Sequence, residues 1–218
     1  MFNIIHPSFG RPSTAWKCYK SWIISKKSDD DIEWYISLNN NDNALNDYYT
    51  EFKDEDVTIV TSDSTNMVQA TNVAADLGKY DYYILVSDDM IPVHAWDVII
   101  QEEFSKYQDV PAVLQFHDGI RNDILTIPVM NGKAFDMLGY IYYPKYISMY
   151  ADNDLTDTCK RLGIYVNTGK QLSEHLHYTI NKSPIDATYK KENSKIAFEY
   201  GKRLYDYRKK LNFPILDA

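Results

Sequence analysis

The chain has 218 residues, of which 44% are hydrophobic and 25% are charged, as in an ordinary globular protein with a sizeable core. Its net charge of −8 argues against a global basic surface of the kind that binds duplex nucleic acid. No apolar run is long enough to span a membrane, and no signal peptide opens the chain, so we expect a soluble, cytoplasmic protein. The two cysteines, Cys18 and Cys159, form neither a zinc motif nor a disulfide framework.

The first half of the chain alternates strand and helix patterns. The strands are expected at 2–6, 33–38, 57–61 and 82–87, and the helices at 12–26, 44–52 and 64–77. This order predicts an α/β fold of the Rossmann-like type, with a mostly parallel central sheet flanked by helices. The loops after parallel strands meet at one edge of such a sheet, where ligands bind. Here these loops are 6–11, 39–42, 62–66 and 88–92.

The second half is less regular. Helices are expected at 94–106, 133–138 and 152–162, and strands at 112–116, 125–129 and 164–166. The segment 184–211 is rich in Lys, Glu and Tyr, which predicts one long exposed helix or two shorter ones. We therefore expect a single domain with its core in residues 1–183 and a helical extension, 184–218, packed on it.

Two adjacent carboxylates, Asp88 and Asp89, follow the apolar strand expected at 82–87, and Pro92 is expected to stop that strand. Adjacent carboxylates repel each other, and a hard divalent cation relieves the repulsion. A solvated acidic turn without a function is the alternative. The position at the ligand edge of the sheet favours a metal site.

Two further pairs of residues have the types that catalysis or metal binding requires. Asp152 and Asp154 begin the helix at 152–162, where an Asp stabilises the helix N-terminus but can also act as a general base. The sequence leaves both roles open for this pair. His175 and His177 share a face if their segment is extended, and Asp with His suits Mn²⁺. Histidines with purely structural hydrogen bonds are the alternative.

The loop at 6–11 ends in Arg11, at the start of a helix where anions bind favourably. Arg can bind a phosphate through two parallel hydrogen bonds, although an ordinary surface arginine is the alternative. The chain contains neither a glycine-rich dinucleotide motif nor a phosphate loop with Gly-Lys-Ser/Thr. A nucleotide at this edge would therefore be bound through a cation and side chains.

Taken together in chain order, these segments resemble the GT-A glycosyltransferases, especially small phage-type or bacterial members similar to family 2. The resemblance covers about residues 1–180. Residues 6–12 resemble the first strand and its Arg-Pro ending, and Ser87-Asp88-Asp89 resembles the DXD metal motif with Ser87 in place of the first acid. The resemblance implies that the nucleotide sugar is bound by Pro7, Arg11, Asn39, Asp42, Asn66, Asn72, Ser87 and Asp88.

The resemblance also implies the roles of the remaining candidates. Asp89 would hold Mn²⁺ or Mg²⁺ with help from Asp88 and from His175 or His177. Asp152 would be the base of an inverting enzyme. The family's usual acidic pair is only half present here, so Asp154 is the alternative base.

The implied function is transfer of a sugar, by a hexosyltransferase-like activity, from a nucleoside diphosphate sugar such as a UDP-sugar to a hydroxyl acceptor. A glycan, a protein, a small molecule and a modified DNA base all remain open as acceptors. Tyr140, Tyr142 and Tyr143 form either an aromatic shelf for the acceptor or part of the core. The alternative functions are a non-catalytic nucleotide-sugar or carbohydrate-binding module and a sugar-phosphate nucleotidyltransferase. The glycine-rich N-terminal loop of the nucleotidyltransferases is absent from this chain.

Overall fold

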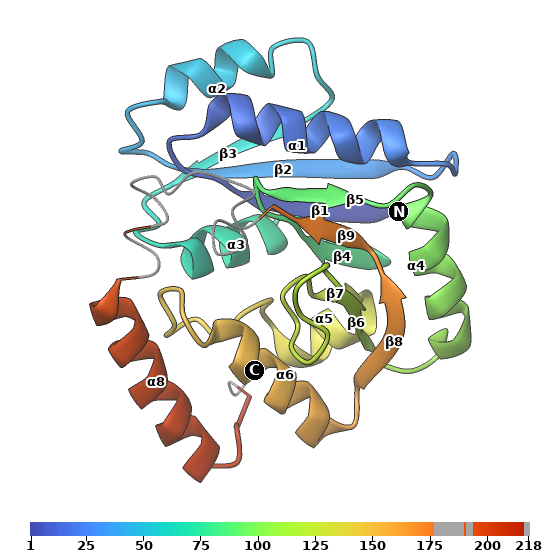
Figure 1. Ribbon diagram of the computed structural model, residues 1–218, viewed down its shortest axis with the longest axis vertical. Helices are drawn as coiled ribbons and strands as arrows, with labels where there is room; N and C mark the ends of the chain where they lie inside the picture. Colours follow the sequence, from blue (N-terminus) through green and yellow to red (C-terminus); the bar gives the residue numbers. More distant parts are fainter. Residues whose placement is uncertain (177–189, 191–193, 216–218) are drawn as a thin grey trace.

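A seven-stranded sheet forms the centre of the structure, a computed structural model that describes residues 1–176, 190 and 194–215 (Figure 1). The strand order is β3-β2-β1-β4-β7-β6-β8. The first four strands along the chain are parallel, β6 is parallel to β8, and β7 is antiparallel to both of its neighbours. The strands are β1 (Phe2–Pro7), β2 (Ile32–Asn39), β3 (Thr58–Ser62), β4 (Tyr82–Leu85), β6 (Val113–His117), β7 (Val129–Asn131) and β8 (Tyr165–Gln171). The mostly parallel α/β sheet expected from the sequence is confirmed.

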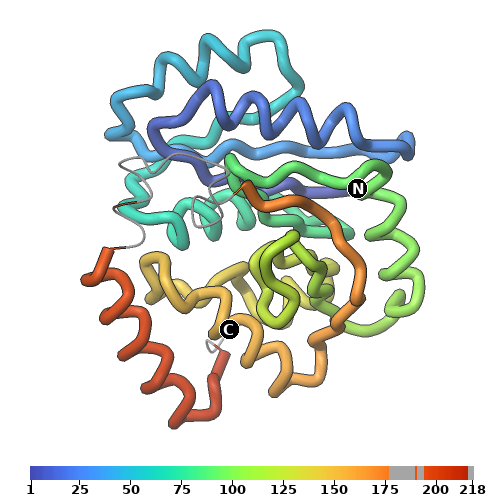
Figure 2. The backbone as a smooth tube through the Cα atoms, viewed as in Figure 1, coloured from blue at the N-terminus to red at the C-terminus, as the bar shows by residue number. Residues whose placement is uncertain are grey.

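Helices cover both faces of this sheet (Figure 2). Neighbouring residues of one strand point to opposite faces, so Ile4 packs in a core with α1, α2 and α4, and Ile5 packs in a second core with α3, α5 and α6. The two cores give three layers, with the sheet in the middle. The helices are α1 (Pro12–Ser25), α2 (Leu45–Glu51), α3 (Met67–Ala75), α4 (Trp96–Phe104), α5 (Gly132–Leu138), α6 (Ala151–Leu162) and α8 (Lys195–Lys210), with a 3-10 turn at Ser105–Tyr107 after α4.

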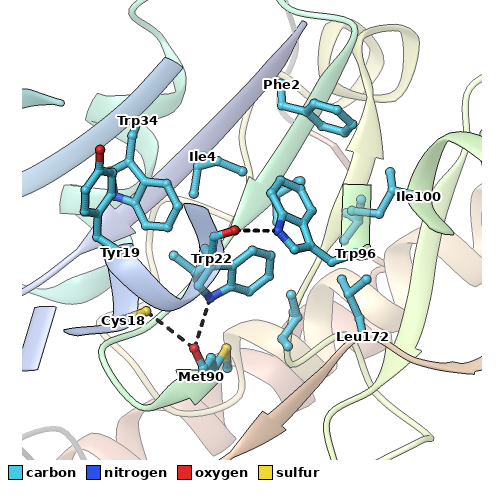
Figure 3. Packing of buried hydrophobic residues seen from close by; sticks show 14 of the residues in the cluster. Phe2, Ile4, Cys18, Tyr19, Trp22, Trp34, Met90, Trp96, Ile100 and Leu172 are labelled. Carbon is cyan, nitrogen blue, oxygen red and sulfur yellow. Dashed lines mark hydrogen bonds between the residues drawn. The ribbon is translucent and has the colours of Figure 1, made fainter. Parts of the chain in front are cut away.

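Tryptophans of the first core fix the chain that follows β4 (Figure 3). The rings of Trp22 and Trp96 pack edge to face with centroids 4.9 Å apart. Trp96 Nε1 donates to the carbonyl of Trp22 (2.8 Å), and Trp22 Nε1 donates to the carbonyl of Met90 (3.0 Å). Cys18 Sγ donates to the same Met90 carbonyl (3.4 Å) and to that of Ser87 (3.2 Å). Helix α1 therefore holds both ends of the turn that contains the two adjacent carboxylates.

A second, two-stranded sheet pairs β5 (Met90–Pro92) with β9 (Ser173–His175) in antiparallel register. Met90 lies opposite His175 in this pairing. The sequence did not predict either strand, because three residues are too few to show a period of two. The pairing places the histidine segment directly beside the turn after β4.

Several element boundaries differ from the expected ones. Strand β4 ends at Leu85, and the turn closed by Met90 N and Ser87 O (3.1 Å) ends it, so the expected stop at Pro92 is wrong. The strand expected at 125–129 is also wrong, since β7 spans Val129–Asn131. The segment before β7 packs on α6 instead, where Leu125 N donates to Thr156 Oγ1 (2.9 Å).

The end of the described chain is the helix α8, which packs against α6 (Figure 1). It accounts for the second part of the helical segment expected at 184–211. The domain boundary expected at residues 183 and 184 lies outside the described residues. Among the helices that the structure describes, none has both the length and the apolar character that a membrane crossing requires.

Candidate active site

The loops after β1, β2 and β3 contact one another at one edge of the sheet, as the sequence predicted. The backbone N–H of Gly10 donates to Asp42 Oδ2 (2.7 Å), which joins the loops after β1 and β2. The side-chain amide of Asn39 donates to the carbonyl of Ser64, which joins the loops after β2 and β3. Asp42 is 6% exposed, so two of the residues implied in nucleotide binding also shape this edge of the sheet.

The two adjacent carboxylates after β4 point to different partners. Asp88 is 7% exposed, and its Oδ1 lies 2.9 Å from His6 Nε2. Its Oδ2 forms an ion pair with Arg11 Nη1 at 3.7 Å. Asp88 is therefore part of a buried polar group at the end of β1, together with the arginine that the sequence singled out. Sequence reasoning missed His6, which is part of the expected first strand.

Asp89 turns toward the β9 segment instead. Its Oδ1 accepts a hydrogen bond from Ser87 Oγ (2.5 Å), and its Oδ2 lies 3.3 Å from His175 Nε2. The expected pairing of Asp89 with a histidine is thus present in the structure. His177, the other candidate, lies outside the described residues.

A third carboxylate, Asp118, contacts the other ring nitrogen of His175. Asp118 is fully buried, and its Oδ2 lies 3.3 Å from His175 Nδ1. Its Oδ1 accepts hydrogen bonds from the backbone N–H groups of Ile120 (2.8 Å) and Arg121 (2.6 Å). Sequence reasoning missed Asp118, although it follows the expected strand at 112–116 just as Asp88 and Asp89 follow theirs.

Hydrogen bonds among Asp89, His175 and Asp118 shift the pKa values of His175 and Asp118. Burial alone would raise the pKa of Asp118, but the hydrogen bonds from His175 and from the backbone outweigh it and lower that pKa. Burial likewise opposes the charged form of His175, but Asp118 and Asp89 outweigh it and raise its pKa to about 9. The histidine is therefore surrounded by negative charge on both sides.

Asp89 and His175 fit a divalent cation that is shared with a substrate. Mg²⁺ and similar ions commonly bind proteins through one or two side chains and take their remaining ligands from phosphates and water. A carboxylate on the far nitrogen of a ligating histidine is the usual arrangement for orienting the ring. Within the described residues, no three His, Cys, Asp or Glu side chains gather into a metal site. A cation held by Asp89 and His175 would therefore need further ligands from a bound molecule or water.

A cavity of about 510 Å³ opens beside this group. Four of the predicted site residues line it: Pro7, Ser87, Asp152 and His175. Asp152 is half-buried in the first turn of α6, and its Oδ1 accepts a hydrogen bond from Asn153 N (2.8 Å). Desolvation raises the pKa of Asp152. The cavity thus joins the metal candidate and the base candidate.

Asp154, the alternative base, is used elsewhere. It is 1% exposed and forms a bidentate ion pair with Arg208, from Nε to Oδ2 (2.6 Å) and from Nη2 to Oδ1 (3.1 Å). Tyr146 also donates a hydrogen bond to Oδ2 (3.0 Å). Among the described residues, those that line the cavity include Asp152 but not Asp154. The contacts of Asp154 make it the anchor of α8.

The two asparagines implied in nucleotide binding have structural contacts. Asn66 caps α3 by accepting a hydrogen bond from Gln69 N (3.0 Å), which also explains why this helix begins later than expected. Asn72 donates to the carbonyl of Tyr142 (2.7 Å) and accepts from the N–H groups of Ile141 and Tyr142 (3.1 Å each). Both side chains therefore stabilise α3 and the segment after α5.

The tyrosines considered as an acceptor shelf are buried. Tyr140, Tyr142 and Tyr143 are 2%, 3% and 8% exposed, so the core interpretation holds for them. Tyr142 still forms part of the cavity wall. The exposed aromatic side chains at the cavity are Phe198 and, half-buried, Tyr150, and sequence reasoning missed both.

Comparison with known proteins gives matches among solved structures alone. No protein-family model matches the chain, and no curated protein matches it. TarS 1–349 from S. aureus in complex with UDP-GlcNAc superposes with a TM-score of 0.64 at 8% identity, over 94% of this chain and 65% of that one. The mannosyltransferase PcManGT from Pyrobaculum calidifontis, in complex with GDP-Man and Mn²⁺, gives a TM-score of 0.65 at 10% identity, over 81% and 57%.

The chain has the GT-A glycosyltransferase fold. This confirms the fold that the resemblance implied. The chain spans about 57–65% of the length of these two solved chains. An identity of 8–10% concerns the fold alone, so activity and substrates are argued from the site.

Proposed function

We propose that the protein is a metal-dependent, inverting glycosyltransferase that moves a sugar from a UDP-sugar to a hydroxyl acceptor. The observation that carries this proposal is that Ser87, His175 and Asp152 line one and the same cavity. It lies at the edge of the sheet where open α/β folds bind ligands. Further support comes from the matched structures, which were solved with UDP-GlcNAc and with GDP-Man and Mn²⁺.

The donor is assigned to the end of the cavity near β4. Asp89 and His175 would hold the cation through Oδ2 and Nε2, the two atoms that lie 3.3 Å apart. A divalent cation bound there would neutralise the charge that grows on the leaving diphosphate. We assign the donor's nucleotide and sugar to the residues at the ends of β1, β2 and β4: Pro7, Arg11, Asn39, Asp42, Ser87 and Asp88.

The acceptor hydroxyl is assigned to Asp152. One of its carboxylate oxygens takes the hydroxyl proton while the acceptor oxygen forms a bond to the anomeric carbon. The bond from that carbon to the diphosphate oxygen breaks, and the electron pair leaves with UDP. Because attack comes from the face opposite the leaving group, the anomeric configuration inverts. The raised pKa of Asp152 makes it a stronger base than an exposed Asp.

The first experiment is a panel of UDP-, GDP- and dTDP-sugars, each with and without Mn²⁺, read by thermal shift and by release of nucleoside diphosphate. We expect a UDP-sugar to raise the melting temperature only with Mn²⁺, because the cation and the diphosphate complete each other's coordination. We expect UDP release when a mixture of hydroxyl acceptors is added.

Variants make the experiment specific. Asp89→Ala should abolish the metal-dependent shift, whereas Asp123→Asn, which changes an exposed carboxylate near the cavity, should leave it intact. Full metal-dependent activity in Asp89→Ala would show that the metal assignment is wrong. Donor binding without UDP release would favour the binding module, and release of pyrophosphate from a nucleoside triphosphate and a sugar phosphate would favour the nucleotidyltransferase.

A further inference from the structure

Two aromatic rings from distant parts of the chain meet at the cavity. Tyr150 precedes α6 directly, and Phe198 lies in the first half of α8. Both line the cavity, and their ring centroids are 5.2 Å apart with the planes at 63°. Phe198 is 44% exposed, so part of its ring is open to a ligand. Asp152, the proposed base, lines the same cavity and lies two residues after Tyr150.

The backbone at Tyr150 has a conformation that a tyrosine rarely adopts. Its φ is 72° and its ψ is 0°, in the left-handed region that favours glycine. Such a conformation persists only when the surrounding structure imposes it, and it is concentrated at functional sites. Here it turns the chain into α6 while the tyrosine ring remains at the cavity.

Helix α8 packs closely against this turn. A β-carbon at Gly201 would lie 2.1 Å from the carbonyl oxygen of Met149, so only glycine allows the helix to approach this turn so closely. The Tyr150 ring lies between Phe198 (5.2 Å) and Tyr205 (5.6 Å) of the same helix. The turn and the helix are thus fitted to each other.

Polar contacts fasten α8 to the same helix that carries the proposed base. The buried pair of Arg208 with Asp154 joins the two helices, and the guanidinium lies 3.5 Å from the centre of the Tyr143 ring. Tyr205 also donates a hydrogen bond to Asp157 of α6. These contacts hold α8 against the helix that carries Asp152.

We propose that Tyr150 and Phe198 form the acceptor subsite, and that the acceptor is a glycan whose terminal pyranose ring packs on them. This inference rests on the proposed glycosyltransferase function. A pyranose has a C–H face that packs on the electron-rich face of an aromatic ring, and hydroxyls around its rim. Polar residues of the same cavity, Ser148, Asp152 and Asn153, lie near the rings in sequence and provide partners for those hydroxyls.

The two rings touch edge to face, which is a favourable arrangement for an aromatic pair. The polar side chains beside them favour a sugar over a flat aromatic acceptor, because a pyranose has several hydroxyls to bind to Ser148, Asp152 and Asn153, whereas phenol has one. The subsite would thus select the class of acceptor.

The test compares Phe198→Ala with wild type, using methyl glycosides of glucose, galactose, mannose and N-acetylglucosamine as acceptors, and phenol as the flat alternative. Tyr207→Ala is the matched control, because Tyr207 is a 60% exposed aromatic residue of the same helix. In Phe198→Ala we expect the acceptor KM to rise about tenfold or more, since the ring contact is lost. The UDP released by donor hydrolysis and the donor-induced thermal shift should not change.

The possible outcomes distinguish a failure of the acceptor-subsite inference from a failure of the proposed glycosyltransferase function. An unchanged KM for the glycosides in Phe198→Ala would overturn the inference, and so would transfer to phenol in preference to every glycoside. If no donor yields UDP, the proposed function fails. Saturation-transfer NMR of the methyl glycosides then still tests the subsite: a signal that is lost in Phe198→Ala and kept in Tyr207→Ala supports it, and any other pattern overturns it.

Discussion

The donor end of the proposed site (Ser87, Asp89, Asp118 and His175) has polar side chains from turns and strand ends, whereas the acceptor end (Tyr150, Asp152 and Phe198) combines a turn, a helix start and a distant helix. Of these residues, Ser87, His175, Tyr150, Asp152 and Phe198 line the cavity. The donor end is held by backbone pairing of β5 with β9 and by hydrogen bonds to buried carboxylates. The acceptor end is held by packing of α8 and by one buried ion pair. Changes at one end should therefore leave the other end working.

Asp152→Asn should give the largest effect, because it removes the proposed base and keeps the shape of the side chain. We expect kcat to fall about 10²- to 10⁴-fold, the usual contribution of a general base. The donor-induced rise in melting temperature with Mn²⁺ should stay at the wild-type value. Both quantities are measured on the same preparation, by UDP release with a methyl glycoside and by thermal shift.

The control for this variant is Asp157→Asn, which changes another carboxylate of α6. It should keep kcat near the wild-type value, because the amide oxygen of Asn can still accept the hydrogen bond from Tyr205 and residue 157 lies outside the set of described residues that line the cavity. A wild-type kcat in Asp152→Asn would remove Asp152 as the base. Loss of the donor shift in Asp152→Asn would show that the two ends are not independent.

Arg208→Ala tests how the acceptor end is held. It leaves the Asp154 carboxylate buried without its bidentate partner, and breaking a buried pair in this way typically costs about 3–5 kcal/mol of unfolding free energy. We expect a lower midpoint in urea unfolding followed by circular dichroism.

Lys209→Ala, a change at the exposed neighbouring residue, serves as the control and should shift the midpoint little. Replacing both members of the pair, with Asp154→Leu and Arg208→Met together, should recover part of the loss because no buried charge then remains unpaired. Equal midpoints for Arg208→Ala and wild type would mean that packing alone holds α8.

Asp118→Asn tests the donor end without touching a proposed ligand. Asp118 acts as a positioning residue, since it contacts His175 Nδ1 while Nε2 faces Asp89. Removing such a partner usually lowers metal affinity about 10- to 100-fold. Calorimetric titration of Mn²⁺ in the presence of UDP measures that affinity directly.

The control is Asp123→Asn, which changes an exposed residue of the same loop and should keep the wild-type affinity for Mn²⁺. The acceptor KM should be the same in both variants, because the acceptor end does not include this loop carboxylate. If Asp118→Asn binds Mn²⁺ with wild-type affinity, Asp118 does not position His175 for metal binding and only stabilises its own turn.

The donor end was largely predictable from the sequence, because its signals are local. An apolar strand followed by Asp88 and Asp89 is visible in a short window, and a parallel sheet brings such strand ends together. The sequence predicted that a histidine, His175 or His177, would lie near Asp89. It did not predict the two short strands that bring His175 there, because these show no periodicity. Asp118 was missed, even though it follows an expected strand in the same way.

The acceptor end was much less predictable, because it depends on contacts between distant segments. Nothing local distinguishes Asp154 from Asp152, and the difference lies in the position of Arg208 on α8. The close approach at Gly201 and the ring contact of Phe198 likewise depend on how α8 packs. Tyr140, Tyr142 and Tyr143 were considered as possible core residues, and they are buried. The exposed ring at the cavity is that of Phe198, which belongs to the distant helix α8.

The smallest expected effect is the pH dependence of the rate, which reports the ionisation of Asp152 at the acceptor end. Desolvation raises the pKa of Asp152 above its ordinary value of 3.8. The charged form takes the proton, so activity falls as pH falls through this raised pKa, and the acid limb of kcat/KM should lie above 3.8. At pH values above this limb the group is ionised, so the rate there should change little with pH. A profile from about pH 4 to pH 8 measures the limb, and a limb that persists unchanged in the residual rate of Asp152→Asn would assign it to another group.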